Sequence, residues 1–415
     1  MPNNFWPSLS TIQYFTSSHL SIAFFLTNYW SFFDEIHGTN WTNRIRWRVT
    51  ECINKTMKCK SWELWFATFI CEDCWTKRVI PFMCHMRCCS SCSKALCDKR
   101  INGIRSRLPT HIPYIHITRT LPAELRDFWL QFRSDKALSI LFNKAHEIII
   151  HFFQSRFWCT PWVFSILHTF WSYINRNPHL HMVVSLGGLS DDKQRISIKD
   201  QYIVYHQIKK QRRALVIKEC RNIVSTLHKN QYEYWKPLFE KTFQKTSWYV
   251  TVSEPIIEVQ KVMWYLTRYM YRAPIAISKI IDSNLIPEDI DNSTITVQYM
   301  HKKPRQKRFI TYTIREFLWL LARHIPDKYF RLVRYSGIFA PNKRKKSITL
   351  IDQQTPPPLS HKTIPERPIT YRSRMITSFG KDPLACSCWW TFDLFSLTYF
   401  SKRTHTFVSK YIDSS

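Results

Sequence analysis

Glycine is scarce in this sequence, which has only 6 glycines among its 415 residues. Loops that cradle phosphates need glycine because the backbone must approach the ligand closely. The sequence contains neither a Walker pattern nor a G-x-G-x-x-G run. This scarcity argues against ATPases, kinases and dinucleotide oxidoreductases, and it predicts a protein that uses no nucleotide cofactor.

Long hydrophobic runs are also missing. The longest run near the start, Leu20 to Leu26, ends at Thr27 and Asn28, far short of the roughly 20 residues that span a bilayer. The run also lacks the basic segment and the small-residue cleavage site of a secretory signal. We therefore expect a cytoplasmic protein without a membrane partner, in which the 13 cysteines are metal ligands or free thiols rather than disulfides.

Acidic residues are few relative to basic ones. Asp and Glu total 30 against 60 for Lys and Arg, which gives a formal net charge of +30. Hydrophobic residues make up 45% and aromatic residues 15% of the chain, too many for a disordered basic tail. The composition predicts a folded protein whose partner carries dense negative charge, and nucleic acid is the commonest such partner.

The length corresponds to two or three domains, and the pattern of strand-like and helix-like runs predicts an α+β fold. We divide the sequence into a helical lead-in at 1–50, a zinc-binding and DNA-binding module at 51–105, and a mixed helix-and-strand domain at 106–345. Residues 346–415 are interpreted as a Pro-rich linker and a basic C-terminal tail.

Cysteines concentrate in the second of these regions. Two Cys-x-x-Cys knuckles, with Cys59 and Cys84 as alternates, can supply four thiolates to one structural zinc ion, which leaves no open position for catalysis. The other interpretation is a set of buried free thiols. The predicted zinc ligands are Cys71, Cys74, Cys89 and Cys92.

Two histidines are predicted to share one face of a strand. In the run from Asn177 to Val184, alternation places His179 and His181 on the same side, where two imidazoles can share a divalent cation. A hairpin between 163–170 and 179–186 puts His168 opposite this pair, as a third ligand or as a structural histidine. The simpler alternative is a pair of half-exposed strand histidines.

Two tyrosines are predicted to share a helix face. The helix is expected to begin near Pro255 and to end at Pro274, and Tyr265 and Tyr269 stand four residues apart on it. A phenolate can attack a DNA phosphodiester whose oxygens are polarised by a cation, so that the bond energy is kept and no ATP is needed. The alternative role of such a pair, or of Tyr271, is packing.

Runs of basic residues are predicted to bind DNA phosphates, which makes affinity fall steeply with salt. Their alternative role is a solvated surface. The predicted DNA contacts are Arg268, Arg272, Lys302, Lys303, Arg305, Lys307, Arg308 and Arg334.

Several motifs occur in one order between about Asn28 and Arg344, and this order is far more specific than any single motif. They are Cys71-x-x-Cys74, Cys84-x4-Cys89-x-x-Cys92, Ile112-Pro113-Tyr114-Ile115-His116 leading to Thr120-Leu121-Pro122, Leu167-His168-Thr169, Asn177-Pro178-His179-Leu180-His181 with Gly187-Gly188-Leu189, Tyr265-Leu266-Thr267-Arg268-Tyr269, and His324-Ile325-Pro326 to Arg334-Tyr335-Ser336-Gly337. Through them the sequence resembles the two-tyrosine HUH transposases of the insertion sequence 91 family, which are related to rolling-circle replication initiators.

The resemblance implies a ferredoxin-like antiparallel sheet that carries the histidine pair, with the tyrosine helix against it and a zinc-binding domain before it. It implies an enzyme that nicks and transfers single-stranded DNA at the ends of a mobile element. His179 and His181 would hold Mg²⁺ or Mn²⁺, with His168 or Glu258 as third ligand. Tyr265 and Tyr269 would be successive nucleophiles.

The sequence departs from the family pattern at three places. Arg119 stands where an aromatic residue is usual, Phe170-Trp171 replaces a Trp-Gly pair, and the C-terminal pair is Cys386-Ser387-Cys388 with one intervening residue instead of two. The last departure argues against a second zinc site. Together they favour, as the alternative, a catalytically inactive zinc-ribbon DNA-binding protein derived from such a transposase.

Overall fold

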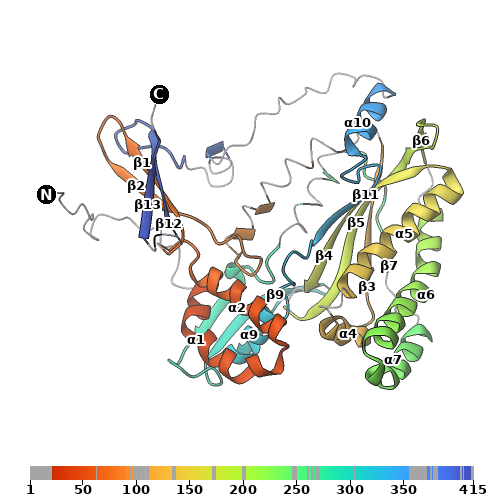
Figure 1. Ribbon diagram of the computed structural model, residues 1–415, viewed down its shortest axis with the longest axis horizontal. Coiled ribbons are helices and arrows are strands. Elements are labelled where there is room, and N and C mark those ends of the chain that lie inside the picture. Colours follow the sequence, from red (N-terminus) through yellow and green to blue (C-terminus); the bar gives the residue numbers. More distant parts are fainter. Residues whose placement is uncertain are drawn as a thin grey trace.

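The structure is a computed structural model that describes residues 21–412 apart from a set of gaps. It has three parts, each with its own antiparallel sheet (Figure 1). No helix in the described ranges is long and apolar enough to cross a membrane. The gaps are 62, 91, 94–95, 98–103, 105–107, 109–111, 133–136, 171–173, 199–201, 245–249, 259–260, 263–265, 267–271, 303, 355–371, 374–375, 377–381, 402–403 and 405.

The largest part is a sheet in the order β11-β4-β5-β3-β7, covered on one side by helices (Figure 1). Short β6 pairs with β5, and all these pairings are antiparallel. Its strands are β3 Tyr114–Thr120, β4 Thr160–Phe170, β5 Arg176–Leu189, β6 Arg195–Ser197, β7 Val250–Val252 and β11 Val333–Gly337. Its helices are η3 Ala123–Leu125, α4 Arg126–Gln131, α5 Ala137–Phe157, α6 Tyr202–Leu227, η5 Lys229–Gln231 and α7 Tyr232–Gln244.

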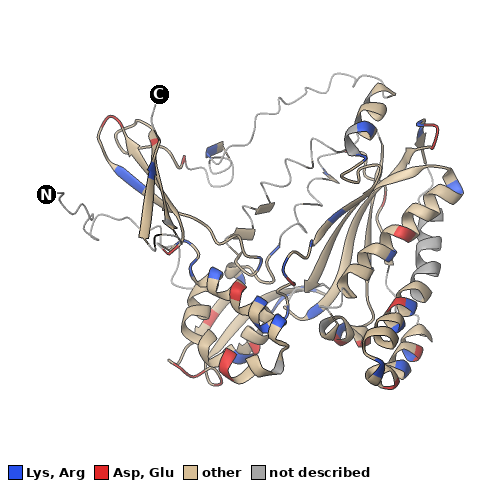
Figure 2. Cartoon of the chain, in the orientation of Figure 1, with Lys and Arg blue, Asp and Glu red and all other residues tan. Residues whose placement is uncertain are grey.

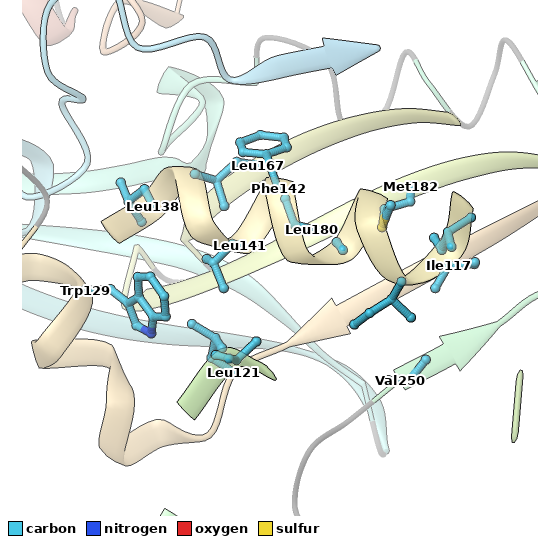
Figure 3. Close-up of a cluster of buried hydrophobic side chains, with 14 of the residues drawn as sticks. Ile117, Leu121, Trp129, Leu138, Leu141, Phe142, Leu167, Leu180, Met182 and Val250 are labelled. Carbon is cyan, nitrogen blue, oxygen red and sulfur yellow. The ribbon is translucent and has the colours of Figure 1, made fainter. Parts of the chain in front are cut away.

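This topology confirms the predicted fold class. The chain runs β3, α5, β4, β5, α6, β7, and the spatial order β4-β5-β3-β7 with antiparallel neighbours is that of a ferredoxin-like sheet, to which β11 adds an edge strand. Alternation gives the sheet two different faces. One face packs Ile117, Leu180 and Met182 against α5 and α6 as the main hydrophobic core (Figure 3). The opposite face carries several histidines and a separate apolar cluster.

The second part joins the N-terminal helices to residues almost 300 positions later. Ser21 caps the first helix by accepting a hydrogen bond from the amide of Phe24, and Phe25 packs edge to face on Phe317 at 5.9 Å. The elements are α1 Ile22–His37, η2 Gly38–Asn40, α2 Asn43–Met57, η6 Ile277–Lys279, β8 Ile280–Asn284, β9 Thr294–Lys302, β10 Arg305–Thr313 and α9 Ile314–Ala322. The sequence-derived boundaries miss this arrangement, because one core joins residues 22–53 to residues 275–325.

The third part also combines distant segments. Its sheet has the order β13-β12-β1-β2. The interpretation of the C-terminus as a tail is wrong, because β12 from that region pairs with β1 and β13 pairs with β12. The strands are β1 Phe66–Cys71, β2 Lys77–Pro81, β12 Phe392–Ser401 and β13 Thr406–Tyr411. Helix α10, Arg344–Gln353, lies beside the large sheet (Figure 1).

The predicted start of the tyrosine helix is also wrong. Ile256 pairs with Tyr114 in an isolated bridge that extends β3, so the chain around Pro255 is still extended. The first helical residues in this described stretch are Lys261 and Val262. Proline occurs in extended segments as well as in the first turn of helices. Pro255 alone therefore does not mark the start of a helix.

Arg119 is buried in the apolar core, and we expect its removal to stabilise the fold. Its side chain is 3% exposed, lines a small cavity with Leu141 and Leu180, and has no hydrogen-bond partner for Nε and Nη1 among the described residues. Burial lowers its pKa to about 9. Because an unpaired buried cation is costly, Arg119→Met should raise the free energy of unfolding by about 1–4 kcal/mol in urea denaturation.

The matched control is Arg305→Met on β10, where the side chain is exposed and the change should stay within about 0.5 kcal/mol. A less stable Arg119→Met variant would show that the guanidinium has stabilising partners.

His146 makes stability depend on pH. This buried ring on α5 lies 2.6 Å from the Ser165 hydroxyl, measured from Nε2 to Oγ, and burial lowers its pKa from 6.5 to about 3. The unfolded chain therefore binds more protons between these values, so stability falls as pH drops through that window. From pH 7 to pH 5 the loss from this ring should be about 2 kcal/mol.

Urea denaturation at both pH values tests this expectation, and His146→Gln should flatten the pH dependence. The same loss in wild type and variant would assign the acid sensitivity to other groups.

Candidate active site and metal centres

Three histidines converge on the face of the large sheet that faces away from α5 and α6. Strand β4 pairs with β5 so that His168 lies opposite His179 and Ile166 opposite His181. The partner of His168 falls within the predicted range of 179 to 181. One ring nitrogen from each histidine lies within 4.8 Å of the others, and all three side chains are buried. The structure thus brings the predicted pair and the tentative third residue together.

Hydrogen bonds orient two of these rings. Nδ1 of His179 lies 2.5 Å from the carbonyl oxygen of Asn177. Nδ1 of His181 lies 3.1 Å from Nε2 of His116 and 3.3 Å from Oγ1 of Thr118. If Nδ1 carries the proton and donates these hydrogen bonds in both rings, Nε2 is the nitrogen left to bind a metal ion. Hydrogen bonds made by the non-ligating nitrogen fix the tautomer of a ligating histidine in this way.

The donor set fits a divalent cation. Three neutral imidazoles leave several coordination positions open for water and phosphate oxygens, and imidazole nitrogen suits transition-metal ions better than Mg²⁺. A cation held there would polarise a phosphodiester oxygen. Glu258, the alternative third ligand, is turned to solvent and forms an ion pair with Lys261 at 2.6 Å. We therefore favour His168 over Glu258 as the third ligand.

The predicted nucleophiles Tyr265 and Tyr269, together with Arg268, lie outside the described residues. Their described neighbours Val262 and Leu266 are fully buried, and they belong to one apolar cluster with Ile166 of β4 and Val183 of β5. Ile166 lies opposite His181 in the pairing, so this cluster is on the histidine face of the sheet.

The cysteines form two separate clusters rather than the predicted single one. The pairing of Cys71 and Cys74 with Cys89 and Cys92 is wrong, because each knuckle finds its partners elsewhere in the chain. The first cluster is Cys59, Cys84, Cys89 and Cys92, and the second is Cys71, Cys74, Cys386 and Cys388.

The geometry of the first cluster fits zinc. Sγ–Sγ distances are 3.6 Å for Cys59 and Cys92, 3.5 Å for Cys84 and Cys92, and 3.6 Å for Cys59 and Cys89. A tetrahedral ion with Zn–S bonds of about 2.3 Å needs sulfurs about 3.8 Å apart. The alternates Cys59 and Cys84 are therefore members of the candidate site.

The predicted DNA contacts fall into different surroundings. Arg305, Lys307 and Arg308 are exposed along β10, on a hairpin with β9 that also carries Lys302, and Arg272 is exposed as well. Lys and Arg occur in all three parts of the chain (Figure 2). Lys303 lies outside the described residues.

Arg334, another predicted DNA contact, is engaged by α5 in this structure. Its guanidinium donates to Ser139 Oγ at 2.8 Å and to Asn143 Oδ1 at 3.1 Å, and it lies 4.4 Å over the ring of Phe142. All three partners are on α5. Arg334 therefore fastens β11 to this helix, on the face of the sheet opposite the histidines.

Sequence reasoning gave no role to His116 and argued against one for Cys386 and Cys388. Strand alternation could have placed His116 on the histidine face once β3 was paired with β5, but that pairing spans the intervening helix and hairpin. The cysteine pairs are more than 300 residues apart in sequence, so no local spacing relates them.

Comparison with known proteins agrees with this organisation. Residues 28–121 match the family described as "Transposase zinc-binding domain", and residues 163–347 match the family described as "Putative transposase". These matches cover the first cysteine cluster and the histidine hairpin respectively. Fold and matches together define a transposase with a zinc-binding N-terminal domain.

Relatives narrow this class. The chain is 26% identical over 304 residues to the transposase for insertion sequence element IS801 of Pseudomonas savastanoi pv. phaseolicola, with 70% of each chain covered. It is 22% identical over 335 residues to "Putative transposase y4qJ" of Sinorhizobium fredii, with 76% of this chain and 80% of the relative covered. The chain is thus similar to transposases of the insertion sequence 91 family. No solved structure matches it significantly.

His116 should control metal affinity without being a ligand. Burial lowers the pKa of His116 to about 4, so its ring is neutral. Its Nε2 can therefore accept a hydrogen bond from the Nδ1–H group of His181. His116→Ala should weaken Mn²⁺ binding about 10–100-fold, as measured by titration calorimetry. His116→Gln, which keeps an acceptor, should recover part of the affinity.

The control is His151→Ala on the exposed side of α5, which should leave Mn²⁺ affinity unchanged. Equal affinity in His116→Ala and wild type would mean that Thr118 alone orients His181.

Proposed function

We propose that this transposase nicks and transfers single-stranded DNA through a covalent phosphotyrosine intermediate, as in rolling-circle transposition. The observation that carries the proposal is the convergence of His168, His179 and His181 on one sheet face. The apolar cluster holding Val262 and Leu266, the described neighbours of Tyr265, lies on that same face. This arrangement supports a metal-dependent DNA strand-transferring endonuclease.

The chemistry conserves phosphodiester bonds. The phenolate oxygen of Tyr265 or Tyr269 attacks phosphorus, the bond from phosphorus to the 3′ oxygen breaks, and the 3′ oxygen leaves as a hydroxyl after taking a proton. A later attack by a 3′ hydroxyl on the phosphotyrosine restores the diester and releases the phenol. The same number of P–O ester bonds is present before and after, so no nucleotide cofactor is required.

The charge distribution supports single-stranded DNA at the element ends as the substrate. Arg305, Lys307 and Arg308 line an exposed hairpin strand, and Phe309 beside them is 59% exposed. Exposed cations that follow a backbone together with an aromatic side chain that can stack on a base are typical of single-strand binding. The reaction would take place in the cytoplasm, on DNA of the nucleoid.

The alternative is a catalytically inactive zinc-ribbon DNA-binding protein. The buried Arg119, with no partner described for two of its nitrogens, favours this alternative because it indicates a core that has lost stability. Both functions predict DNA binding, so a covalent DNA adduct separates them.

The decisive experiment incubates full-length protein and Mn²⁺ with labelled single-stranded oligonucleotides from the element ends, then resolves the products in SDS. We expect an SDS-resistant adduct. His181→Ala should abolish it while leaving salt-sensitive DNA binding nearly unchanged, and His151→Ala should retain it. The absence of an adduct in wild type at several Mn²⁺ concentrations would support the inactive alternative.

Substitution of the tyrosines tests the two-nucleophile mechanism in the same assay. Tyr265→Phe and Tyr269→Phe should each retain some adduct but block full transposition, because one phenol holds the first strand end while the other makes the second cut. The double variant should form none, and Tyr271→Phe is the control. If Tyr269→Phe alone eliminates the adduct while Tyr265→Phe transposes normally, the enzyme has a single nucleophile.

A further inference from the structure

The second cysteine cluster joins the two ends of the described chain. One pair, Cys71 and Cys74, lies at the end of β1, and the other pair, Cys386 and Cys388, lies just before β12. The Sγ atoms are 3.4 Å apart between Cys71 and Cys388, and also 3.4 Å apart between Cys74 and Cys386. All four sulfurs lie within 4.8 Å of one another.

The two pairs are held by turns of similar shape. The amide of Trp75 donates to the carbonyl of Cys71 at 2.9 Å, and the amide of Trp389 donates to the carbonyl of Cys386 at 3.1 Å. Both tryptophans, each directly after the second cysteine of its pair, have left-handed φ values of 58° and 73°. The single residue between Cys386 and Cys388 therefore does not prevent the second pair from turning its thiols toward the first.

Among the described residues, the hydrophobic cluster of this part is small. The buried apolar residues of its core are Cys71, Cys386 and Phe392, and the residues packed on them are Phe69, Leu384 and Cys388. Half of this core consists of the cysteines themselves. A core of this size contributes too little hydrophobic burial to stabilise a four-stranded sheet, and small modules of this kind need a metal or disulfides.

We propose that Cys71, Cys74, Cys386 and Cys388 bind a zinc ion of their own, which fastens strands β12 and β13 to β1. The ion is distinct from the one expected at Cys59, Cys84, Cys89 and Cys92, because no cysteine is shared between the clusters. Two Sγ–Sγ distances of 3.4 Å, with all four sulfurs within 4.8 Å of one another, approach the spacing of a tetrahedral zinc-thiolate site. On binding, the thiols lose their protons to solvent. The competing chemistry is oxidation of the two 3.4 Å pairs to two disulfides. Each pair would then have to shorten to about 2.05 Å.

Zinc content of the full-length protein, purified under reducing conditions, tests the proposal. Wild type should contain two zinc ions per chain by elemental analysis, and Cys386→Ala/Cys388→Ala should contain one. Cys59→Ala/Cys84→Ala should also lose one ion, which shows that the sites are independent. The control is Cys159→Ala/Cys220→Ala, two buried thiols outside both clusters, which should keep two.

Limited proteolysis supplies a readout that does not depend on DNA cleavage. Loss of the second ion should release β12 and β13 from β1, so trypsin should remove the C-terminal segment faster in Cys386→Ala/Cys388→Ala than in the control. Replacement with Co²⁺ should give visible bands of tetrahedral thiolate coordination, with half the intensity in this variant. One zinc ion in wild type and in Cys386→Ala/Cys388→Ala alike would overturn the proposal, as would two disulfides at these cysteines under reducing purification.

Discussion

The antiparallel pairing of β4 with β5 is the constraint on which the candidate active site depends. Because side chains alternate along a strand, the pairing of His168 with His179 puts these rings on one face with His181 and puts Leu167, Leu180 and Met182 on the other. A slip of one residue would turn the histidines into the core and the apolar residues outward. Burial of the apolar side therefore fixes the register, and the fixed register holds the histidines together.

The first cysteine cluster adds a second constraint, since it connects to the same hairpin. Arg87, which lies between two of its ligands in sequence, donates from Nη2 to the carbonyl of Leu167 at 3.5 Å. Leu167 is the neighbour of His168. A structural zinc ion at this cluster would thus order a loop that touches β4 next to a candidate metal ligand. This hydrogen bond connects the first cysteine cluster to the histidine hairpin, although the two sites share no residue.

Features that depend on residues close together in the sequence could be predicted, and features that depend on residues far apart could not. The histidine pair and the hairpin come from local alternation, and the structure keeps both. The cysteine pairing and the composite core around Phe25 and Phe317 depend on contacts between residues about 300 positions apart, and local spacing contains no signal for them. The predicted pairing of Cys71 and Cys74 with Cys89 and Cys92 illustrates this limit. Two knuckles close in sequence suggested one ion, but β1 carries the first knuckle away to meet β12.

Arg119 affects the stability of the core and lies away from the histidine site. It lies on β3 opposite Leu180, on the helix-facing side of the sheet, whereas Thr118 beside it lies opposite His181. The desolvation of its guanidinium is therefore a cost to the core and does not change the donors that face the metal site. A destabilising core residue of this kind lowers the fraction of molecules that are folded. It leaves the arrangement of the histidines unchanged in the molecules that do fold. The presence of Arg119 is thus compatible with an intact histidine site in the molecules that remain folded.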